Sequence, residues 1–266
     1  MQDFASGPVL IVGCGRLGSA VVEGWLDHGP VDPRRLMIVT PSPKAVADRA
    51  ERAGARINPG SEQLASVQAV VLAVKPAVWR AAVADLPGAL DWDAVIISLM
   101  AGVRADDIRE ATGRSVVRLM PTTAVAQGRG VAAVWSEDRG AVEAAAQLFG
   151  PLADIVSLAT EDQIDVATAV AGSGPAYIHA FARAMAEAGV EAGLSPDDAV
   201  RLARGAVRSA AAAPMDDDLE KLIARIASPG GTTQAGLKAA EEAGLGAAAK
   251  AAVSAALRRA RELSGQ

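Results

Sequence analysis

Short runs of apolar, β-branched residues alternate with amphipathic stretches along the first 158 residues. Such runs predict buried parallel strands, because a strand that is covered on both faces needs no polar alternation. The predicted strands are 8–12, 36–40, 55–57, 69–74, 94–99, 115–120, 131–135 and 154–156. The predicted helices are 19–28, 44–53, 78–86, 104–111 and 139–149, with a short helical or turn segment at 61–66. This order predicts a doubly wound α/β sheet.

The pattern changes after Leu158, where no strand pattern follows and only helical spacing continues. The predicted helices are 161–171, 175–192, 196–213, 216–227, 232–242 and 246–263. We therefore predict a sheet domain at residues 1–158 and an all-helical domain at residues 159–266. Several of these helices are apolar on more than one face, which a domain of about a hundred residues cannot bury alone. We expect a homodimer through the helical half; the alternative is that these faces pack against the sheet domain.

The composition narrows the class of protein. Of the 266 residues, 51% are apolar, the formal net charge is −5, and no basic stripe indicates a nucleic-acid partner. No apolar run is long enough to span a membrane, and Met1 to Gly7 lack the features of a signal peptide. The single cysteine, Cys14, indicates a reducing, cytoplasmic location. The two histidines provide little material for a metal site, so we expect no metal.

A glycine motif joins the first predicted strand to the first predicted helix. The motif has the form G-x-G-x-x-G and reads Gly13, Cys14, Gly15, Arg16, Leu17 and Gly18. Glycine at these positions permits a tight turn, the approach of a pyrophosphate and close packing of the helix on the strand. The motif therefore predicts a dinucleotide-binding domain of the Rossmann type. Cys14 occupies a variable position and is interpreted as a small packing residue.

The end of the second predicted strand bears on the choice of dinucleotide. An NAD site usually has a carboxylate there, which binds the ribose hydroxyls and repels a 2′-phosphate. This chain instead has Thr40, followed by Ser42 and Lys44 in a proline-rich loop. Ser42 can donate a hydrogen bond and Lys44 supplies a positive charge, so we predict NADP in preference to NAD. The alternative is a proline-rich loop in which the lysine is incidental, and use of NAD stays open.

Two further glycine-containing turns lie in the helical half. Ser228 to Thr233 reads SPGGTT and opens a predicted helix, whose free N–H groups can bind an anion such as a carboxylate. The alternative is an ordinary turn between helices with a threonine N-cap.

Gly172 to Tyr177 reads GSGPAY and interrupts the helical pattern before a long helix. In one interpretation this turn lies beside the nicotinamide. In the other it is a kink between helices at which small residues pack against each other.

Taken together, these motifs resemble those of pyrroline-5-carboxylate reductases in order and approximate spacing, from about residue 8 to residue 263. The motifs that carry the resemblance are the glycine motif, 73–76, 98–102, 118–121, 172–177 and 228–233. The resemblance implies NADPH- or NADH-dependent reduction of 1-pyrroline-5-carboxylate, a cyclic imine, to L-proline, the last step of proline biosynthesis. It also implies a homodimer through the helical domains, which can assemble further into a ring of dimers.

The resemblance implies further cofactor contacts in the sheet domain. These are Ala73, Val74, Lys75, Pro76, Met100, Ala101 and Thr122. Proline stops the strand before it, and the carboxyl ends of parallel strands are where ligands bind in such sheets. One departure concerns residues 120–124, which read MPTTA where the family usually has MPNTP. Thr122 replaces an asparagine near the nicotinamide ribose and has one hydrogen-bonding group fewer.

The resemblance also implies how the substrate is held. The backbone N–H groups of Gly230, Gly231 and Thr232, with Ser228 nearby, would bind the carboxylate, and the Thr233 hydroxyl would face the ring nitrogen. A threonine hydroxyl is a poor acid, so Thr233 is interpreted as a positioning donor or a proton relay, with the proton coming from solvent or from an already protonated imine. Hydroxyacid dehydrogenases of similar architecture carry a lysine where this chain has the apolar Ile178. Orientation of the reactants would therefore provide most of the catalysis.

Two other functions stay open at this point. One is reduction of a different cyclic imine carboxylate, for which the departures at Thr122 and Ala124 are the main support. The other is a non-catalytic relative that binds a nucleotide, against which the presence of both the cofactor and the substrate motif argues.

Overall fold

The computed structural model describes residues 4, 6–84, 86, 88–213 and 218–263. These residues form two compact units: a sheet unit, which comprises residues 1–172 and 257–266, and a helical unit of residues 173–256. Each unit is treated separately below. Residues 216–217, where a predicted helix begins, lie outside the described residues.

The sheet unit contains eight strands in the order β3-β2-β1-β4-β5-β6-β7-β8. Their bounds are β1 Val9–Val12, β2 Leu36–Val39, β3 Arg56–Ile57, β4 Ala69–Leu72, β5 Val95–Ser98, β6 Val116–Pro121, β7 Gly130–Trp135 and β8 Ala153–Ser157. Strands β1 to β6 are parallel, whereas β7 pairs with β6 in the antiparallel direction. Residues 122–129 are too few for a crossover to a parallel strand. The doubly wound sheet is thus confirmed, with its last two strands reversed.

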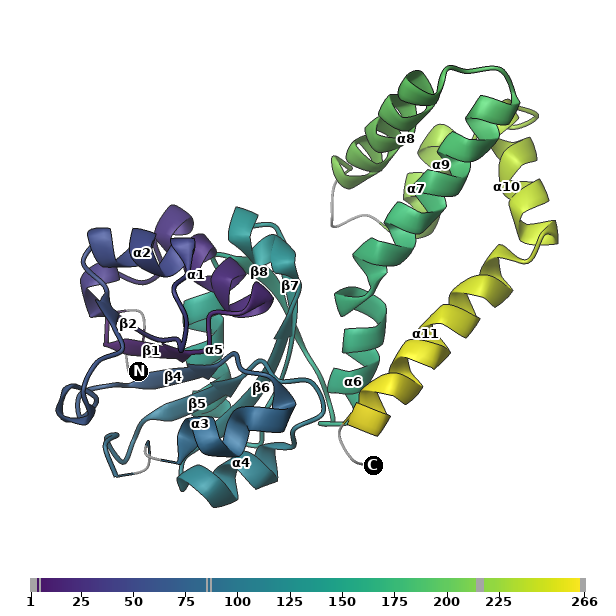
Figure 1. The fold of residues 1–266 in the computed structure, drawn as a ribbon. Helices are drawn as coiled ribbons and strands as arrows, with labels where there is room; N and C mark the ends of the chain where they lie inside the picture. The colour runs from purple at the N-terminus through teal and green to yellow at the C-terminus, as the bar shows by residue number, and fades with distance from the viewer. Residues whose placement is uncertain (1–3, 5, 85, 87, 214–217, 264–266) are drawn as a thin grey trace. The chain divides into compact units, whose positions relative to one another are not determined.

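Helices cover both faces of this sheet (Figure 1). The helices are α1 Arg16–His28, α2 Ala45–Arg52, α3 Trp79–Val83, α4 Ala105–Thr112, α5 Arg139–Phe149 and α6 Gln163–Ala167. Short 3-10 turns lie at η1 Pro33–Arg35, η2 Ser61–Gln63, η3 Pro76–Val78 and η4 Thr123–Gln127. Side chains of β1 point alternately to two apolar clusters, one shared with α1, α2 and α5 and the other with α3 and α4. Burial on both faces explains the uninterrupted apolar runs.

Parallel pairing brings the ends of β1, β4 and β5 level at one edge, beyond which β6 continues to Pro121. Val12 in β1 is level with Leu72 in β4, and Leu72 is level with Ser98 in β5. Ser98 is in turn level with Arg118 in β6. The segments that follow these strands therefore emerge at a common edge, which contains the predicted cofactor residues.

The helical unit contains α7 Gly174–Glu191, α8 Pro196–Ala211, α9 Leu219–Ile226, α10 Thr232–Glu242 and most of α11 Leu245–Leu263. Ser195 caps α8, since its hydroxyl accepts a hydrogen bond of 3.2 Å from the Asp198 N–H. Between α7 and α8 lies a small alanine-rich core. The helical segment predicted at 161–171 is present but changes type: α6 ends at Ala167 and is followed directly by a π-helical turn, η5 Thr168–Gly172. The domain boundary at 158–159 stays a prediction, based on where the last strand ends.

Candidate functional site

Glycine shapes the turn that follows β1. Gly13 has a φ of 101°, in the left-handed region, and a Cβ atom there would lie 2.7 Å from the carbonyl oxygen of Ala73. A Cβ atom at Gly18 would lie 2.2 Å from the carbonyl oxygen of Gly13. Gly15, in contrast, faces open space. Two of the glycines therefore allow close packing of the turn, and the third leaves room for a ligand.

Helix α1 begins at this turn with free backbone N–H groups. Gly15 is its N-cap, and no side chain of the described residues caps it. The first N–H group that bonds back to the N-cap is that of Ser19, 2.8 Å from the Gly15 carbonyl oxygen. Arg16 is exposed at the first helical position, and Leu17 packs against the core. An uncapped helix start beside an open glycine fits the pyrophosphate of a dinucleotide.

Cys14 packs within this turn. Its side chain is buried, and the Ser19 hydroxyl donates a hydrogen bond of 3.1 Å to its carbonyl oxygen. Burial raises the pKa of the Cys14 thiol. The thiol is therefore protonated at neutral pH and is not a nucleophile.

Asn58, which directly follows the neighbouring strand β3, fixes the loop after β2 by a hydrogen bond. The Thr40 N–H donates a hydrogen bond of 2.9 Å to Asn58 Oδ1, and the Thr40 hydroxyl donates one of 3.1 Å to the carbonyl oxygen of Ser42. Ser42 is exposed, and Lys44 stands at the N-cap of α2 without a side-chain cap among the described residues. This geometry places a positive charge next to a second free helix start, which suits a phosphate.

An apolar slot of 550 Å³ lies beside this loop. It is lined by Val12, Gly13, Val39, Thr40, Pro41, Asn58, Val74, Val78, Ala81 and Ala82. Such a slot suits a flat, weakly polar ring such as the adenine of a dinucleotide. Asn58 was not among the predicted residues. Among the described residues it is the sole non-glycine with a positive φ, 47°, and asparagine directly after a strand was the available signal in the sequence.

The predicted residues after β4 and β5 lie at the same edge of the sheet. The Ala73 N–H donates a hydrogen bond of 2.8 Å to the Val12 carbonyl oxygen and extends the pairing of β1 with β4. Lys75 is exposed, and Pro76 begins η3. Met100 is buried, and its N–H lies 3.4 Å from the Ser98 hydroxyl. Ala101, which follows it, is half-buried.

Thr122, which replaces the asparagine of the resembled family, forms two hydrogen bonds with Val131 of β7. Its N–H donates a hydrogen bond of 2.9 Å to the Val131 carbonyl oxygen, and its hydroxyl accepts one of 3.3 Å from the Val131 N–H. The side chain is buried. The hydroxyl thus helps to join β7 to the end of β6 and retains one hydrogen for a ligand.

The predicted carboxylate site forms the turn between α9 and α10. Gly230 has a φ of 72°, and a Cβ atom at Gly231 would lie 2.5 Å from the Ser228 hydroxyl oxygen. Gly231 is the N-cap of α10, and no side chain of the described residues caps that helix. Helix α10 begins at Thr232, so the N–H groups of Thr232 and Thr233 lie in its first turn, where helices leave such groups unpaired.

The two glycine N–H groups of this turn already have partners. The Gly231 N–H donates a hydrogen bond of 3.0 Å to the Ser228 carbonyl oxygen. The Gly230 N–H donates one of 2.7 Å to Gln234 Oε1. Gln234 was not predicted, because a glutamine within a helix carries no signal of this contact. The turn is therefore shaped to receive an oxygen acceptor at Gly230.

The predicted residues thus gather in two places. The cofactor candidates lie along one edge of the sheet unit, and Ser228 to Thr233 lie in the helical unit. No group of three or more His, Cys, Asp or Glu side chains in the described part of the chain could hold a metal ion. None of the described helices combines the length and apolarity that a membrane span requires.

Comparison with known protein families gives two matches along the chain. Residues 8–102 match the family model described as NADP oxidoreductase, coenzyme F420-dependent. Residues 161–263 match the model described as pyrroline-5-carboxylate reductase dimerisation. The first match covers the cofactor candidates from Gly13 to Ala101 but not Thr122, and the second covers the helices that carry the carboxylate site.

Curated proteins and solved structures agree with these matches. The chain is 34% identical to pyrroline-5-carboxylate reductase of Arabidopsis thaliana over 261 residues, which cover 95% of this chain and 94% of that protein. It is 30% identical to the Escherichia coli enzyme of the same name, over 87% of this chain and 88% of that one. The structure of a Coxiella burnetii pyrroline-5-carboxylate reductase superposes with a TM-score of 0.86 at 28% identity, covering 97% and 99% of the two chains. The chain therefore belongs to the pyrroline-5-carboxylate reductase family.

Proposed function

We propose that this protein reduces 1-pyrroline-5-carboxylate to L-proline with NADPH, the last step of proline biosynthesis. The observation that carries the proposal is a pair of uncapped, glycine-lined helix starts, at α1 and at α10, in a member of this family. Each suits one of the two anionic reactants: the pyrophosphate of the cofactor and the carboxylate of the substrate.

The sheet unit would bind the cofactor. The N–H groups at the start of α1 would hold the pyrophosphate, and the slot beside Asn58 would take the adenine. Lys44 and the start of α2 would bind the 2′-phosphate, which favours NADP; NAD is the lesser alternative. Lys75, Met100, Ala101 and Thr122 would border the nicotinamide end. When bound, the reduced nicotinamide supplies the hydride that the imine carbon receives.

The turn before α10 would bind the substrate carboxylate. The carboxylate would displace Gln234 Oε1 from the Gly230 N–H and accept further hydrogen bonds from the first turn of α10. Each charge-assisted hydrogen bond contributes about 1.5–3 kcal/mol. The helix end adds about 0.3–1 kcal/mol. Binding by backbone groups fixes the orientation of the ring without a charged side chain.

Thr233 would orient the imine nitrogen rather than ionise. Its hydroxyl can donate one hydrogen bond to a ring nitrogen, or accept one from a protonated imine. The proton then comes from solvent or from an imine that binds in its protonated form. Catalysis would depend mainly on the arrangement of donor and acceptor, which can raise effective concentrations by many orders of magnitude.

The main alternative substrate is a different cyclic imine carboxylate. The departure at Thr122 raised this alternative, but the curated relatives named pyrroline-5-carboxylate reductase, at 30–34% identity, do not favour it. A panel of five- and six-membered cyclic imine carboxylates, assayed by NADPH absorbance, separates the two. We expect the highest kcat/KM for 1-pyrroline-5-carboxylate and a higher rate with NADPH than with NADH. A six-membered ring as the best substrate contradicts the proposal, and a clear preference for NADH contradicts the cofactor assignment.

Gly15→Ala tests the pyrophosphate site. A methyl group at Gly15 meets no protein atom within 4 Å, so the free energy of unfolding should change by less than about 0.5 kcal/mol. The methyl group would occupy ligand space, and the Kd for NADPH should rise about tenfold or more, equivalent to about 1.4 kcal/mol. The matched variant Gly18→Ala should instead lose about 1–3 kcal/mol of stability, because its Cβ atom meets the Gly13 carbonyl oxygen. Unchanged NADPH binding in Gly15→Ala contradicts the assignment.

Thr233→Ala tests the orienting hydroxyl. Loss of one hydrogen bond to the reacting ring should lower kcat about 10- to 100-fold. The Kd for NADPH should change less than about twofold, since Thr233 faces the substrate in this proposal. Thr233→Ser keeps the hydroxyl and should recover most of the activity. Wild-type turnover in Thr233→Ala would refute the role.

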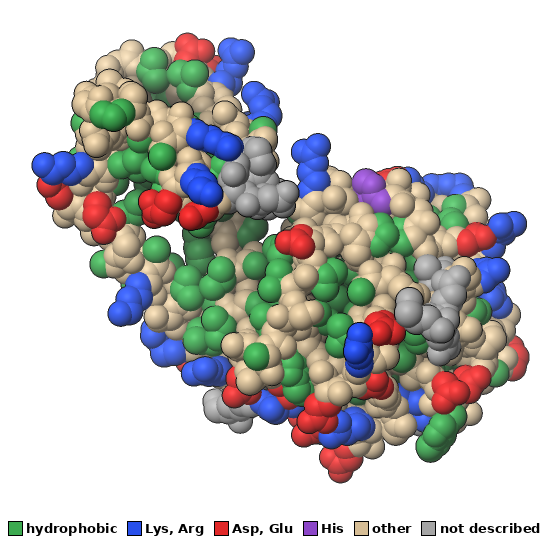
Figure 2. All heavy atoms as spheres, turned by 180° about the vertical axis from the view of Figure 1, so that it is seen from behind, with side chains coloured by type: hydrophobic (Ala, Val, Ile, Leu, Met, Phe, Trp, Pro, Cys, Tyr) green, Lys and Arg blue, Asp and Glu red, His purple; other side chains and the backbone are tan. Residues whose placement is uncertain are grey.

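The proposal extends to a homodimer through the helical unit. Figure 2 shows apolar side chains open on the surface of this unit, with charged side chains around them. The exposed apolar residues here include Ile178, Phe181, Met185, Val190, Leu194, Val200, Leu202, Leu219, Ile223, Ile226, Leu237 and Leu245. None of the described residues of α9 and α10 is buried. A surface of this kind needs a partner, and a second copy supplies one.

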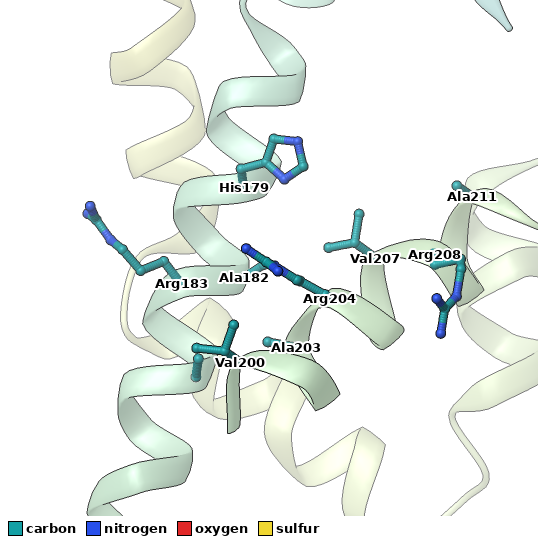
Figure 3. Close-up of a pocket in the computed structure, with 10 residues that line it drawn as sticks. His179, Ala182, Arg183, Val200, Ala203, Arg204, Val207, Arg208 and Ala211 are labelled. Atoms are coloured by element: carbon teal, nitrogen blue, oxygen red, sulfur yellow. The ribbon is translucent and has the colours of Figure 1, made fainter. Parts of the chain in front are cut away.

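A groove of 610 Å³ between α7 and α8 belongs to the same surface (Figure 3). Ala182, Ala203 and Val207 form its apolar floor, and Arg204 reaches from α8 towards α7. Small residues along a groove let a helix approach closely, so a helix of a second copy is the proposed occupant. A ring of such dimers and a cytoplasmic location are further parts of the proposal.

Phe181→Asp tests the dimer. Phe181 is 51% exposed in the single chain, and a charge there would be costly to bury in an interface. Sedimentation velocity should show a monomer for Phe181→Asp and a dimer for the unmodified chain. The control Trp92→Asp replaces an exposed aromatic residue of the sheet unit and should stay dimeric. A dimeric Phe181→Asp would count against this interface.

A further inference from the structure

A cluster of buried charges lies in the sheet unit, apart from the residues assigned to either ligand. Arg118 on β6, Glu161 before α6 and Asp165 on α6 are all buried, and Arg118 is only 2% exposed. Arg118 Nη1 lies 3.2 Å from Glu161 Oε1, and Arg118 Nη2 lies 3.5 Å from Asp165 Oδ1. Charged side chains are costly to bury, even as pairs. Apolar residues would fill this space at lower cost, so the cluster indicates a role beyond packing.

Glu161 is the centre of the cluster. Its Oε1 also accepts a hydrogen bond of 2.8 Å from the backbone N–H of Ala105, the first residue of α4. Its Oε2 lies 2.8 Å from Nη2 of Arg104, the N-cap of α4. A single carboxylate therefore joins the start of α4, strand β6 and the segment that leads into α6.

Helix α4 and strand β6, which Glu161 joins, are both adjacent to predicted cofactor residues. Met100 and Ala101 lie in the loop between β5 and α4, and Thr122 directly follows β6. All three are at the carboxyl edge of the sheet. Glu161 thus contacts the elements next to two loops that would border the nicotinamide. The slot beside Asn58 lies at β1 to β4, away from this contact.

We propose that Glu161 is a positioning residue for the reduction, which holds the loop after β5 and the end of β6 at the spacing that the nicotinamide half of NADPH requires. This inference rests on the proposed function. Glu161 acts through Arg104, Arg118 and the Ala105 N–H and touches neither reactant. The π-helical turn that follows α6 gives separate support, because such turns are frequent at functional sites.

Glu161→Gln tests the proposal by a binding measurement that is independent of turnover. The variant keeps the shape of the side chain and one acceptor oxygen but removes the charge that holds both arginines. Calorimetry should show the Kd for NADPH raised at least tenfold. The Kd for adenosine 2′,5′-bisphosphate, which lacks the nicotinamide half, should change less than twofold. The matched control is Asp162→Asn, which removes the exposed partner of Arg104 and should bind both ligands as the unmodified chain does.

Equal loss of affinity for both ligands in Glu161→Gln would show that Glu161 has a purely structural role. Unchanged affinity for both ligands would show that it has no role in cofactor binding. Either outcome overturns the proposal. If Glu161→Gln does not fold, Arg104→Lys replaces it. The Arg104 side chain is 39% exposed, and its lysine variant should raise the Kd for NADPH at least threefold and leave that for the bisphosphate unchanged. Failure of the unmodified chain to bind NADPH or to reduce 1-pyrroline-5-carboxylate would refute the proposed function instead.

Discussion

The close approach of the turn after β1 to the end of β4 is the constraint on which the cofactor site depends. A side chain at Gly13 would meet the carbonyl oxygen of Ala73, and one at Gly18 would meet the carbonyl oxygen of Gly13 itself. Because both positions lack a Cβ atom, α1 starts directly at the sheet edge. This helix start has no side-chain cap among the described residues, and a Cβ atom at Gly15 would meet no atom within 4 Å. The slot lined by Asn58 and the uncapped start of α2 lie farther along the same edge of the sheet, beside β2.

The helical unit contains a second uncapped helix start with a glycine N-cap, which is proposed to bind a smaller anion. A glycine with positive φ turns the chain into α10, and the helix starts without a side-chain cap among the described residues. Gln234 Oε1 on the Gly230 N–H shows that this turn accepts an oxygen atom. Neither helix start carries an acid or base that titrates near neutral pH. In the proposed function, each helix start binds one anionic reactant, and catalysis depends on the orientation of the bound reactants.

Sequence patterns predicted much of this arrangement, because apolar runs and glycine motifs are local signals. The helix predicted at 232–242 has the bounds of α10, and the glycine motif follows β1 as expected, although α1 begins within it, at Arg16. The reversed direction of β7 was missed, since residues 131–135 are apolar in either direction and only the short connection before them was informative. Gln234 was missed because its contact arises from the folded backbone, and Asn58 was missed although it directly follows a strand. Glu161 and Arg118 are 43 positions apart, and a single sequence contains no sign that they pair.

The central claim is that the chain aligns a bound cofactor and a cyclic imine for direct hydride transfer. NADPH that carries deuterium at the transferred position of the nicotinamide tests this claim when it is mixed with 1-pyrroline-5-carboxylate and the product is examined by mass spectrometry. The account predicts one deuterium on Cδ of L-proline for each NADPH oxidised. Oxidation of NADPH without labelled proline, or proline that contains no deuterium, would contradict it.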